Sequence, residues 1–453
     1  MSFQGCSGNK GALTAALLAA GCSAIAGEDT NIVRAARTDE DASWESVFTE
    51  ENQVPFHINF YVKEGLYYEV METSEYEGAF YTSIFSEKRR VTGRLGMKVH
   101  LDAALYQEKG ALPAADNNFA FRRFRVNTFG RGFLLSPFTY GVEFGMADGK
   151  FFFNDGYVWF HEVPYVSSIK GGIFTAPMSM EALQSSSATA MMEVGSPITA
   201  FTPGDLLGLQ LGGALKNKPV TLHGGWFADV NDSENRDASQ SYARLIGRAT
   251  WLPVDEVEEN PDGKIIHLGA SFSHMFTAGD GARYRSRPES YLAPFLIDTE
   301  PLGGDRAMVY GLEGAWQKGS VMVRGEFLQA HADDAADQTH RFGGAYLMAS
   351  WVLTGERRAY NRDGGYFTKV TPARAFSFRD KSWGALEWTT RLSHSDLSDE
   401  QIQGGVMTIL STGFNVYTSK RGRIMFNAGV ADVKNSPTPG EFYFLQTRFQ
   451  IDL

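Results

Sequence analysis

Three arginines stand at every second position of one short segment, as Arg283, Arg285 and Arg287. If this segment is a β-strand, the three side chains leave the same face at intervals of about 6.6 to 7 Å. A guanidinium group offers forked N–H donors that suit oxyanions. Like charges in a line are costly against lipid, so in a membrane strand they would face a water-filled interior. The alternative is a solvated face that pairs with acids on a neighbouring strand.

Catalytic and metal-binding motifs are not evident in the sequence. His161 and Glu162 begin like a zinc-protease motif, but the second histidine is missing and Pro164 follows. No Gly-x-Ser-x-Gly elbow, Walker loop or dinucleotide fingerprint occurs. The nine histidines are scattered, and His100 is interpreted as an interior polar residue rather than a ligand. The sequence predicts no enzymatic activity, no cofactor and no metal.

The composition favours strands over helices. The 453 residues include 48 Gly, 33 Phe, 18 Tyr and 8 Trp, a mixture typical of many strands and tight turns. A formal net charge of -11 argues against nucleic acid as a partner. Away from the N-terminus no run of eighteen apolar residues occurs, which excludes α-helical membrane spans. The mean hydropathy of -0.24 is compatible with a β-barrel, whose strands show lipid only every second residue.

Residues 1–26 have the pattern of a signal peptide. Lys10 supplies a positive charge, residues 12–21 are an apolar run, and small residues precede a cleavage point after Ala26. A lipobox that ends at Cys22 is the alternative, and it would lipidate that cysteine. Either interpretation predicts export.

The cysteines and the acidic region that follows the leader bear on the exported chain. The full chain has two cysteines, Cys6 and Cys22, and both lie at or before the predicted cleavage points. The exported chain is therefore expected to carry no disulfide. Residues 27–56 are acidic and aperiodic, which predicts a mobile or loosely docked N-terminal segment.

From residue 57 to the end, apolar and polar residues alternate with period two. In the clearest stretch, Leu95 and Leu101 share one face while His100 and Asp102 share the other. Roughly sixteen to eighteen such segments occur, separated by Gly-, Asn- and Asp-rich turn signals. The pattern predicts an all-β fold over residues 57–453.

Alternation alone does not say which face is covered. The segments are about ten or more residues long, which suits tilted membrane strands better than soluble ones. The leader and the aromatic residues near segment ends also favour a transmembrane antiparallel β-barrel over the alternative, an exported soluble all-β protein. The aromatic residues in question are Tyr106, Phe119, Phe121, Trp159, Tyr284, Tyr291, Trp351 and Tyr417.

Several short motifs occur in a characteristic order. They are residues 92–95 (TGRL), 121–125 (FRRFR), 172–181 (GIFTAPMSME), 283–289 (RYRSRPE), 353–356 (LTGE), 382–387 (SWGALE), 404–405 (GG) and 413–417 (GFNVY). In this order and spacing the chain resembles the phosphate- and polyphosphate-selective porins of Gram-negative outer membranes. The resemblance implies a barrel of about sixteen strands in outer-membrane lipid, a homotrimer, and termini on the periplasmic side.

The resemblance also implies a pore constriction and its lining. A loop at about 175–204 is expected to fold inward, and this stretch breaks the period-two pattern and carries four methionines, which suit an irregular wall. Small anions such as phosphate or polyphosphate are expected to pass by diffusion along an arginine ladder. The anion-binding residues implied are Arg283, Arg285, Arg287, Arg94, Arg122 and Arg123. Because Arg122 and Arg123 are adjacent, a bulge or a rim position is needed for one of them.

Two positions depart from the family pattern. Thr175 stands where family members often carry a lysine, so a general anion preference is predicted more firmly than phosphate selectivity. The chain ends in Leu453, where such barrels commonly end in Phe. A weakly selective general porin is therefore the alternative within the porin interpretation.

Overall fold

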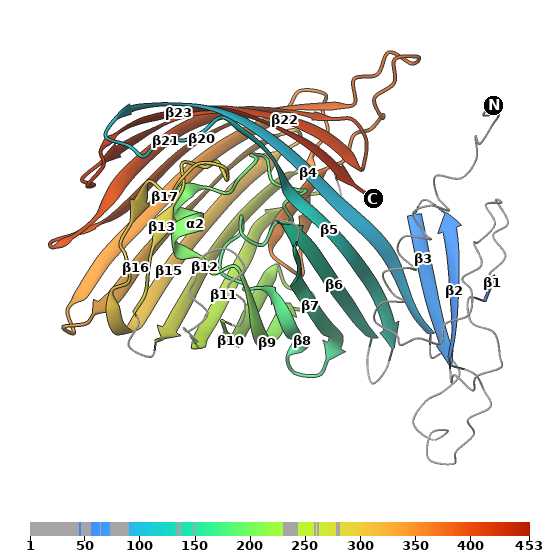
Figure 1. Ribbon diagram of the computed structural model, residues 1–453. Helices are drawn as coiled ribbons and strands as arrows, with labels where there is room; N and C mark the ends of the chain where they lie inside the picture. The colour runs from blue at the N-terminus through green and yellow to red at the C-terminus, as the bar shows by residue number, and fades with distance from the viewer. Residues whose placement is uncertain are drawn as a thin grey trace, which may run out of the picture. The chain divides into compact units, whose positions relative to one another are not determined.

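The computed structural model describes the strands and their connections over most of the chain (Figure 1). The predicted signal peptide, Cys22 and most of residues 27–56 lie outside the described residues. Two compact units are present, one of Met1–Gly96 with Val126–Val142 and one of Met97–Arg125 with Glu143–Leu453. The described ranges are 45–46, 56–63, 65–72, 90–133, 137–147, 150–229, 243–257, 260, 262–277 and 281–453.

Sixteen antiparallel strands form a closed barrel, as predicted. Strand β23 closes the barrel by pairing with β4, so that Arg448 lies opposite Asp102. The strands are β4 (Arg90–Gly110), β5 (Asn118–Phe133), β6 (Pro137–Ala147), β7 (Lys150–Val163), β8 (Ser167–Thr175), β9 (Asp205–Ala214), β10 (Val220–Ala228), β11 (Ala243–Asp255), β12 (Lys264–Phe276), β15 (Gly303–Lys318), β16 (Val321–Asp334), β17 (Thr339–Val352), β20 (Ala385–Asp399), β21 (Ile402–Tyr417), β22 (Gly422–Lys434) and β23 (Gly440–Asp452).

Three short strands precede the barrel. They are β1 (Glu45–Ser46), β2 (Phe56–Lys63) and β3 (Gly65–Glu72), of which β2 and β3 form a hairpin. Within the first compact unit, β3 pairs with the beginning of β4. The barrel was predicted to begin at residue 57, but its first strand begins at Arg90, because the alternating residues before it form this separate hairpin.

The alternation along each strand separates the interior from the outer surface. On β4, His100 and Asp102 are buried while Leu105 is exposed, and on β23 Arg448 is buried between exposed Leu445 and Phe449. The polar face is therefore the inner one, the arrangement of a membrane barrel and the reverse of a soluble sandwich.

Only part of the predicted aromatic belt lies on the outer surface. Phe119, Phe121 and Trp351 are exposed there, as expected. Tyr284 and Tyr417 are buried, because each belongs to a side-chain network inside the barrel. Among the described residues, no helix is long and apolar enough to cross a membrane.

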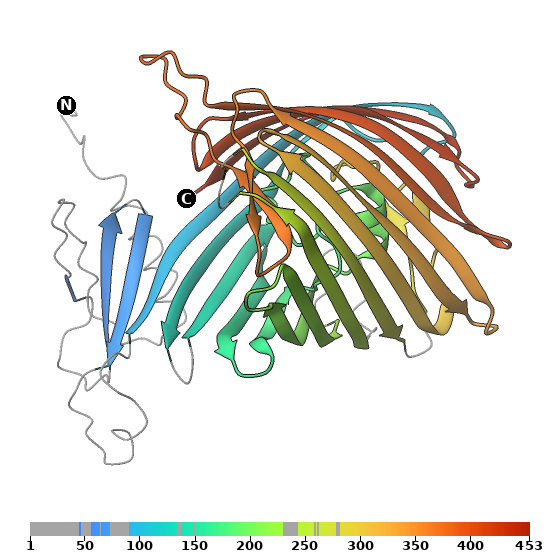
Figure 2. The same ribbon diagram turned by 180° about the vertical axis from the view of Figure 1, so that it is seen from behind.

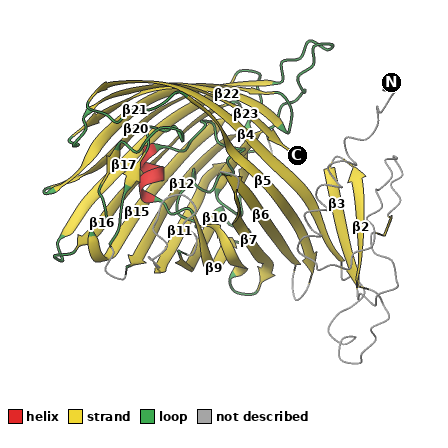
Figure 3. Cartoon of the chain, in the orientation of Figure 1, coloured by secondary structure: helices red, strands yellow, loops and turns green. Residues whose placement is uncertain are grey.

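Three connections fold into the barrel interior, where Figures 1 and 2 show them within the ring of strands. Residues 176–204 carry the short helix α2 (Ser196–Phe201), drawn in red in Figure 3. Residues 281–302 carry the paired strands β13 (Arg285–Ser286) and β14 (Ile297–Asp298). In residues 353–384, the hairpin of β18 (Arg358–Asn361) and β19 (Tyr366–Val370) enters from the end of the barrel where β17 and β23 finish, whereas residues 371–384 stay outside the interior (Figure 1).

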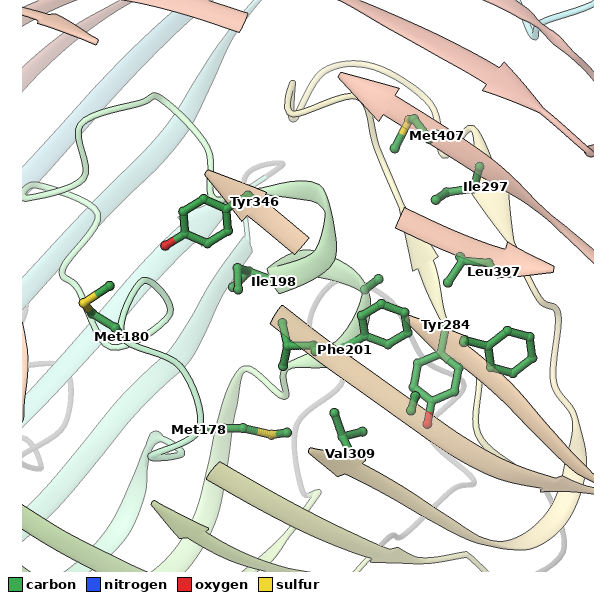
Figure 4. Close-up of a cluster of buried hydrophobic side chains, with 14 of the residues drawn as sticks. Met178, Met180, Ile198, Phe201, Tyr284, Ile297, Val309, Tyr346, Leu397 and Met407 are labelled. Carbon is green, nitrogen blue, oxygen red and sulfur yellow. The ribbon is translucent and has the colours of Figure 1, made fainter. Parts of the chain in front are cut away.

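An apolar core joins the three inward segments to the wall, and Figure 4 shows part of it. Phe201 of α2 packs on Tyr284 with ring centroids 5.3 Å apart, and Ile198 is buried beside them. Val309 and Leu397 contribute from wall strands. Burial of each such side chain contributes about 1.5 to 3 kcal/mol, so the inward segments are packed like the core of a soluble domain.

Candidate functional site

Arg283, Arg285 and Arg287 do not lie on a barrel strand, so that version of the prediction is wrong. They belong to the inward segment between β12 and β15, where Arg285 is opposite Asp298 in a pair of two-residue strands. The alternation is nevertheless real, because Tyr284 is buried between the arginines. An amphipathic extended segment has the same pattern whether it forms the wall or packs against it from inside.

The buried face of this segment packs against other parts of the interior. The ring of Tyr284 contacts Phe201 of α2 and, at 5.7 Å between centroids, Phe342 of β17. The Ser286 hydroxyl donates a hydrogen bond to the Ser196 carbonyl at 3.2 Å. The arginines therefore emerge on the opposite face.

The opposite face carries guanidinium groups stacked on aromatic rings. The Cζ atom of Arg285 is 4.3 Å from the centroid of Phe295, and that of Arg287 is 3.9 Å from the same ring. Arg287 is also 5.3 Å from Tyr291, whose ring lies 3.6 Å from Arg122 of β5. We call these five residues, with the terminal Arg283, the arginine–aromatic row. Each such contact contributes about 0.5 to 2 kcal/mol. The ring covers the flat face of the guanidinium group and leaves the N–H groups at its edge for hydrogen bonds.

Arg283 lies at the solvent end of the row. Its Nε and Nη2 atoms donate to the two carboxylate oxygens of Asp298 at 2.9 and 2.7 Å, and Nη2 is 3.0 Å from Glu300. The side chain is 35% exposed, so these pairs are screened by water and salt. At Arg283, the structure therefore matches the alternative interpretation of the sequence, in which the arginines pair with acids on a neighbouring strand.

Arg122 and Arg123 both lie close to Glu193 of the inward segment 176–204. Arg122 donates to both oxygens of Glu193 at 3.1 and 3.4 Å, and the charge of Arg123 interacts with the same carboxylate. Arg125 donates to the buried Glu143 at 2.8 Å. Because Arg122 and Arg125 are three residues apart and both reach interior carboxylates, β5 departs from strict alternation here, as the adjacent arginines required.

The carboxylate of Glu193 remains ionised in this setting. Burial alone would raise its pKa, but the charges of Arg122, Arg448 and Arg123 hold the pKa well below its usual range. Glu193 therefore ties the row to the segment 176–204.

The two remaining predicted positions lie elsewhere. Arg94 is on β4 opposite Tyr67, in the first compact unit, whereas the row lies entirely in the second. The hydroxyl of Thr175, at the end of β8, donates to Asp205 at the beginning of β9. The position where relatives often carry a cation thus holds a neutral side chain bonded to an acid.

A second set of arginines was missed by sequence reasoning. Their guanidinium groups are buried and each is bound to carboxylates. Arg448 forms a forked pair with Asp102, with both distances 2.7 Å. Arg391 is 2.6 Å from Glu289 and 3.2 Å from Glu181. We call this set the anchor arginines: Arg248, Arg324, Arg358, Arg391 and Arg448.

The carboxylates around the anchor arginines also bind backbone N–H groups of the inward segment 176–204. Glu326 accepts from the N–H of Met180 at 3.1 Å and that of Glu181 at 2.8 Å. Glu181 in turn accepts from the N–H of Gly195 at 2.9 Å. The inward segment is thus held by a buried network of hydrogen bonds and ion pairs.

The third inward segment, 353–384, is held in the same way. Arg358 donates to both oxygens of Glu387 at 2.8 Å, and the Tyr417 hydroxyl donates to Glu387 at 2.6 Å. Arg248 donates to the carbonyls of Gly364 and Gly365 at 2.8 and 2.6 Å. The one sequence signal for this element is a long break in the period-two pattern between two clear strands.

Metal binding is not indicated in the described part of the chain. No group of three or more His, Cys, Asp or Glu side chains there is arranged to hold a metal ion. His100 faces the interior, as expected, and is completely buried.

An apolar outer surface, a charged interior and inward-folded connections in a closed barrel are the architecture of an outer-membrane porin. The family model for phosphate-selective porins O and P matches residues 94–453. The chain therefore belongs to this family, and it is a protein of the outer membrane.

Two relatives show how far the sequence similarity extends. Porin O of Pseudomonas aeruginosa is 23% identical over 319 residues, which are 64% of this chain and 68% of Porin O. An uncharacterized protein of Caulobacter vibrioides is 28% identical over 294 residues, 62% of this chain. The match spans 56% of the length of that protein.

Solved structures share the fold at low sequence identity. The anion-selective porin from Comamonas acidovorans superposes with a TM-score of 0.52 at 11% identity, over 80% of this chain and 100% of that one. The outer membrane channel DcaP of Acinetobacter baumannii has a TM-score of 0.50 at 9% identity, over 80% of this chain and 97% of that one. At these identities the similarity concerns the barrel fold.

Proposed function

We propose that this porin lets small anions, phosphate or polyphosphate among them, diffuse across the outer membrane along the arginine–aromatic row. The observation that carries the proposal is the alternation of Arg285, Phe295, Arg287, Tyr291 and Arg122 inside the barrel. An oxyanion would pass from one guanidinium edge to the next, held at each by charge-assisted hydrogen bonds weak enough to release it. Passive diffusion of this kind requires no covalent step and no cofactor.

The row suits this role better than the anchor arginines do. Each anchor guanidinium is committed to a carboxylate, as Arg448 is to Asp102. In the row, the ring of Phe295 stacks on Arg285 and Arg287 and positions their guanidinium groups. The local charge, rather than the net charge of -11, sets the field that a passing anion meets.

A weakly selective general porin is the second candidate, and one observation favours it. Thr175 replaces the lysine common in the family and bonds to Asp205, which brings an acid where a cation would strengthen phosphate binding. Asp298 and Glu300 beside Arg283 would in addition disfavour multiply charged anions at that end of the row. Phosphate selectivity would therefore be modest, while chloride and phosphate would both pass.

We also propose, from membership of the family, that the channel is a homotrimer narrowed by residues 175–204, with its termini toward the periplasm. The leader is expected to be cleaved after Ala26 or processed at Cys22. Native mass spectrometry of protein extracted from membranes would measure both the subunit number and the mass of the processed chain. A monomer, or an unprocessed N-terminus, would contradict the corresponding part of this proposal.

Planar-bilayer recording tests the channel and the row together. Single-channel conductance and reversal potential would be measured in KCl gradients, with and without phosphate, for the natural chain and for the triple variant Arg283→Ala, Arg285→Ala, Arg287→Ala. A matched control removes three exposed basic residues in turns outside the barrel interior, as Lys216→Ala, Lys218→Ala, Lys420→Ala. We expect stepwise conductance and an anion-favouring potential that the triple variant loses and the control keeps.

Two other results would contradict the proposal at different points. If the triple variant forms channels with unchanged selectivity, the protein is still a porin, but the row is excluded as the anion path. Folded protein that forms no channels would overturn the transport proposal itself.

A further inference from the structure

Residues 371–384 project from the barrel on the side where β17, β21 and β23 end, which we call the C-terminal end. They follow the inward hairpin β18–β19 and precede β20. Figures 1 and 2 show this orange segment rising beyond the ends of the wall strands, near the C-terminus. Other connections at this end, such as 319–320 and 418–421, are tight turns. The projecting segment has no role in the row or the anchor network.

The projecting segment carries a cluster of aromatic rings exposed to the surroundings. The ring of Phe376 meets Phe378 edge to face at 4.8 Å and Trp383 at 5.9 Å between centroids. Phe378 is 85% exposed and Trp383 is 66% exposed. Keeping two large rings in water is unfavourable, and such a grouped apolar patch is typical of an interaction site.

The cluster is presented by a structured turn. Ser377 and Ser382 exchange two backbone hydrogen bonds of 2.9 and 3.0 Å, and the Ser377 hydroxyl donates to Asp380 at 2.8 Å. The Phe376 N–H donates to the Thr418 carbonyl of the neighbouring turn at 2.7 Å. The rings are therefore positioned before any partner binds, which lowers the entropy lost on binding.

Basic side chains surround the aromatic cluster. Arg374, Arg379 and Lys381 are all exposed, and Asp380 is the acid among them. This local excess of positive charge stands in a chain whose net charge is -11. Aromatic rings at the headgroup level beside Arg and Lys are the combination that binds the interface of an anionic lipid membrane.

The cluster continues the lipid-facing surface of the barrel. At the C-terminal end, Trp351 of β17 and Trp388 of β20 lie opposite each other, and both are exposed on the outer face. Leu353 is also exposed, and its N–H bonds the Leu386 carbonyl at 2.7 Å at the root of the projecting segment. The chain thus passes directly from the lipid-facing belt into the aromatic turn.

We propose that residues 371–384 form a membrane anchor that inserts Phe378 and Trp383 into the lipid leaflet at the C-terminal end and prefers anionic phospholipid. The belt around Trp351 and Trp388 already lies against lipid, and the adjoining turn has the charge and ring content to remain there. Anchoring at this point would fix the connection that carries the inward hairpin. The proposal is independent of which anion the pore conducts.

A fluorescent label beside the cluster tests this anchor. In the full chain with Cys6→Ser and Cys22→Ser, a single cysteine is introduced as Ala375→Cys, which keeps the three rings and the three basic residues. The label, an environment-sensitive dye, is recorded in phosphatidylcholine vesicles with and without phosphatidylglycerol. We expect a shift to shorter wavelength and quenching by lipids spin-labelled near the headgroup, both greater with phosphatidylglycerol. The matched control is Lys218→Cys, in an exposed turn at the same end that lacks aromatic residues, and it should show neither change.

Two further variants of the labelled protein separate the contributions. Phe378→Ser with Trp383→Ser should abolish the quenching, whereas Arg379→Gln with Lys381→Gln should retain it and remove the dependence on phosphatidylglycerol. Absence of quenching in the parent protein, or quenching equal to that of the Lys218→Cys control, would overturn the anchor. Self-quenching between labels that rises with the protein-to-lipid ratio would instead identify a second copy of the chain as the occupant and would also overturn it.

Discussion

Two sets of arginines inside one barrel are held in opposite ways. The anchor arginines meet carboxylates, as Arg391 meets Glu289 and Glu181, and their guanidinium groups are almost completely buried. Arg285 and Arg287 of the row stack on Phe295 and are half-buried, whereas Arg122 and Arg283 at the two ends of the row also bind carboxylates. Facing the interior of a porin is therefore not enough to make an arginine an anion site. A carboxylate partner already compensates the charge of each anchor arginine.

The difference also separates stability from selectivity. Removing one member of a buried ion pair leaves an uncompensated charge, whereas losing a stacked guanidinium leaves an aromatic ring that needs no partner. Two carboxylates join the regions. Glu193 binds Arg122 of the row and the anchor residue Arg448, and Glu289, just after the row arginines in sequence, binds the anchor residue Arg391. Variants of the two sets should therefore differ in stability and in ion selectivity.

The largest effect is expected for Arg391→Ala. The change leaves Glu289 and Glu181 without their shared cation in a buried site, which should destabilise the barrel by about 3 to 5 kcal/mol. Urea unfolding followed by the shift between folded and unfolded bands on unboiled gels would measure it. Arg285→Ala is the matched control and should cost about 1 kcal/mol or less. Equal unfolding midpoints for the two variants would contradict the division into anchor and row.

An intermediate effect is expected for Glu289→Gln. The amide oxygen can still accept from the Ser196 N–H, a bond of 3.1 Å, but the charge that pairs with Arg391 is lost. The free energy of unfolding should fall by about 1 to 3 kcal/mol, and the anion preference should change because the row is tied through this residue. Unfolding and reversal potential would be measured on one preparation. A change in stability with unaltered selectivity would show that the two regions are independent.

A smaller effect is expected when the rings of the row are replaced. Tyr291→Leu with Phe295→Leu retains apolar bulk but removes stacking worth about 0.5 to 1 kcal/mol for each guanidinium. The permeability ratio of anions to cations should fall, though less than in the triple arginine variant. Phe151→Leu, which changes an exposed ring of β7 outside the interior, is the control. An unchanged ratio would mean that the rings do not position the arginines.

The smallest effect is expected from acidification. Because the pKa of Glu193 is depressed, the stabilisation from its pairs with Arg122 and Arg448 is complete above its unfolded-state pKa of about 4.3 and is lost only as the pH falls through the lower folded value. The reversal potential should therefore be the same at about pH 8 and about pH 5 as far as this group contributes. A shift in that range that disappears in Glu193→Gln would show that the carboxylate titrates near neutrality.

Much of the fold could be predicted from the sequence because strand alternation is a local property. The pattern around Leu105 and His100 divides the strand into two faces, and the structure confirms this division and places the polar face inside. An inward fold of about 175–204 was implied by the family resemblance, and the break in the alternation there is compatible with it. The hairpin β18–β19 interrupts the alternation in the same manner and was not recognised.

The candidate site could be predicted only in part. The identity of Arg283, Arg285 and Arg287 as a row on one face followed from their spacing, but their position on an inward segment did not. Tyr291 and Phe295 carry no local signal that marks them as stacking partners. The forked pair of Arg448 and Asp102 joins residues 346 positions apart and exists because β23 closes the barrel against β4.

The sequence by itself determined the period-two alternation, the all-β class, the division of each strand into an apolar and a polar face, and the arginine content of one segment. Only the tertiary structure decided which segments leave the wall and which partner each arginine meets. The physical reason is that alternation depends on neighbouring residues along one strand, whereas ion pairs and ring stacks depend on side chains brought together by barrel closure and by the folding of three connections into its interior.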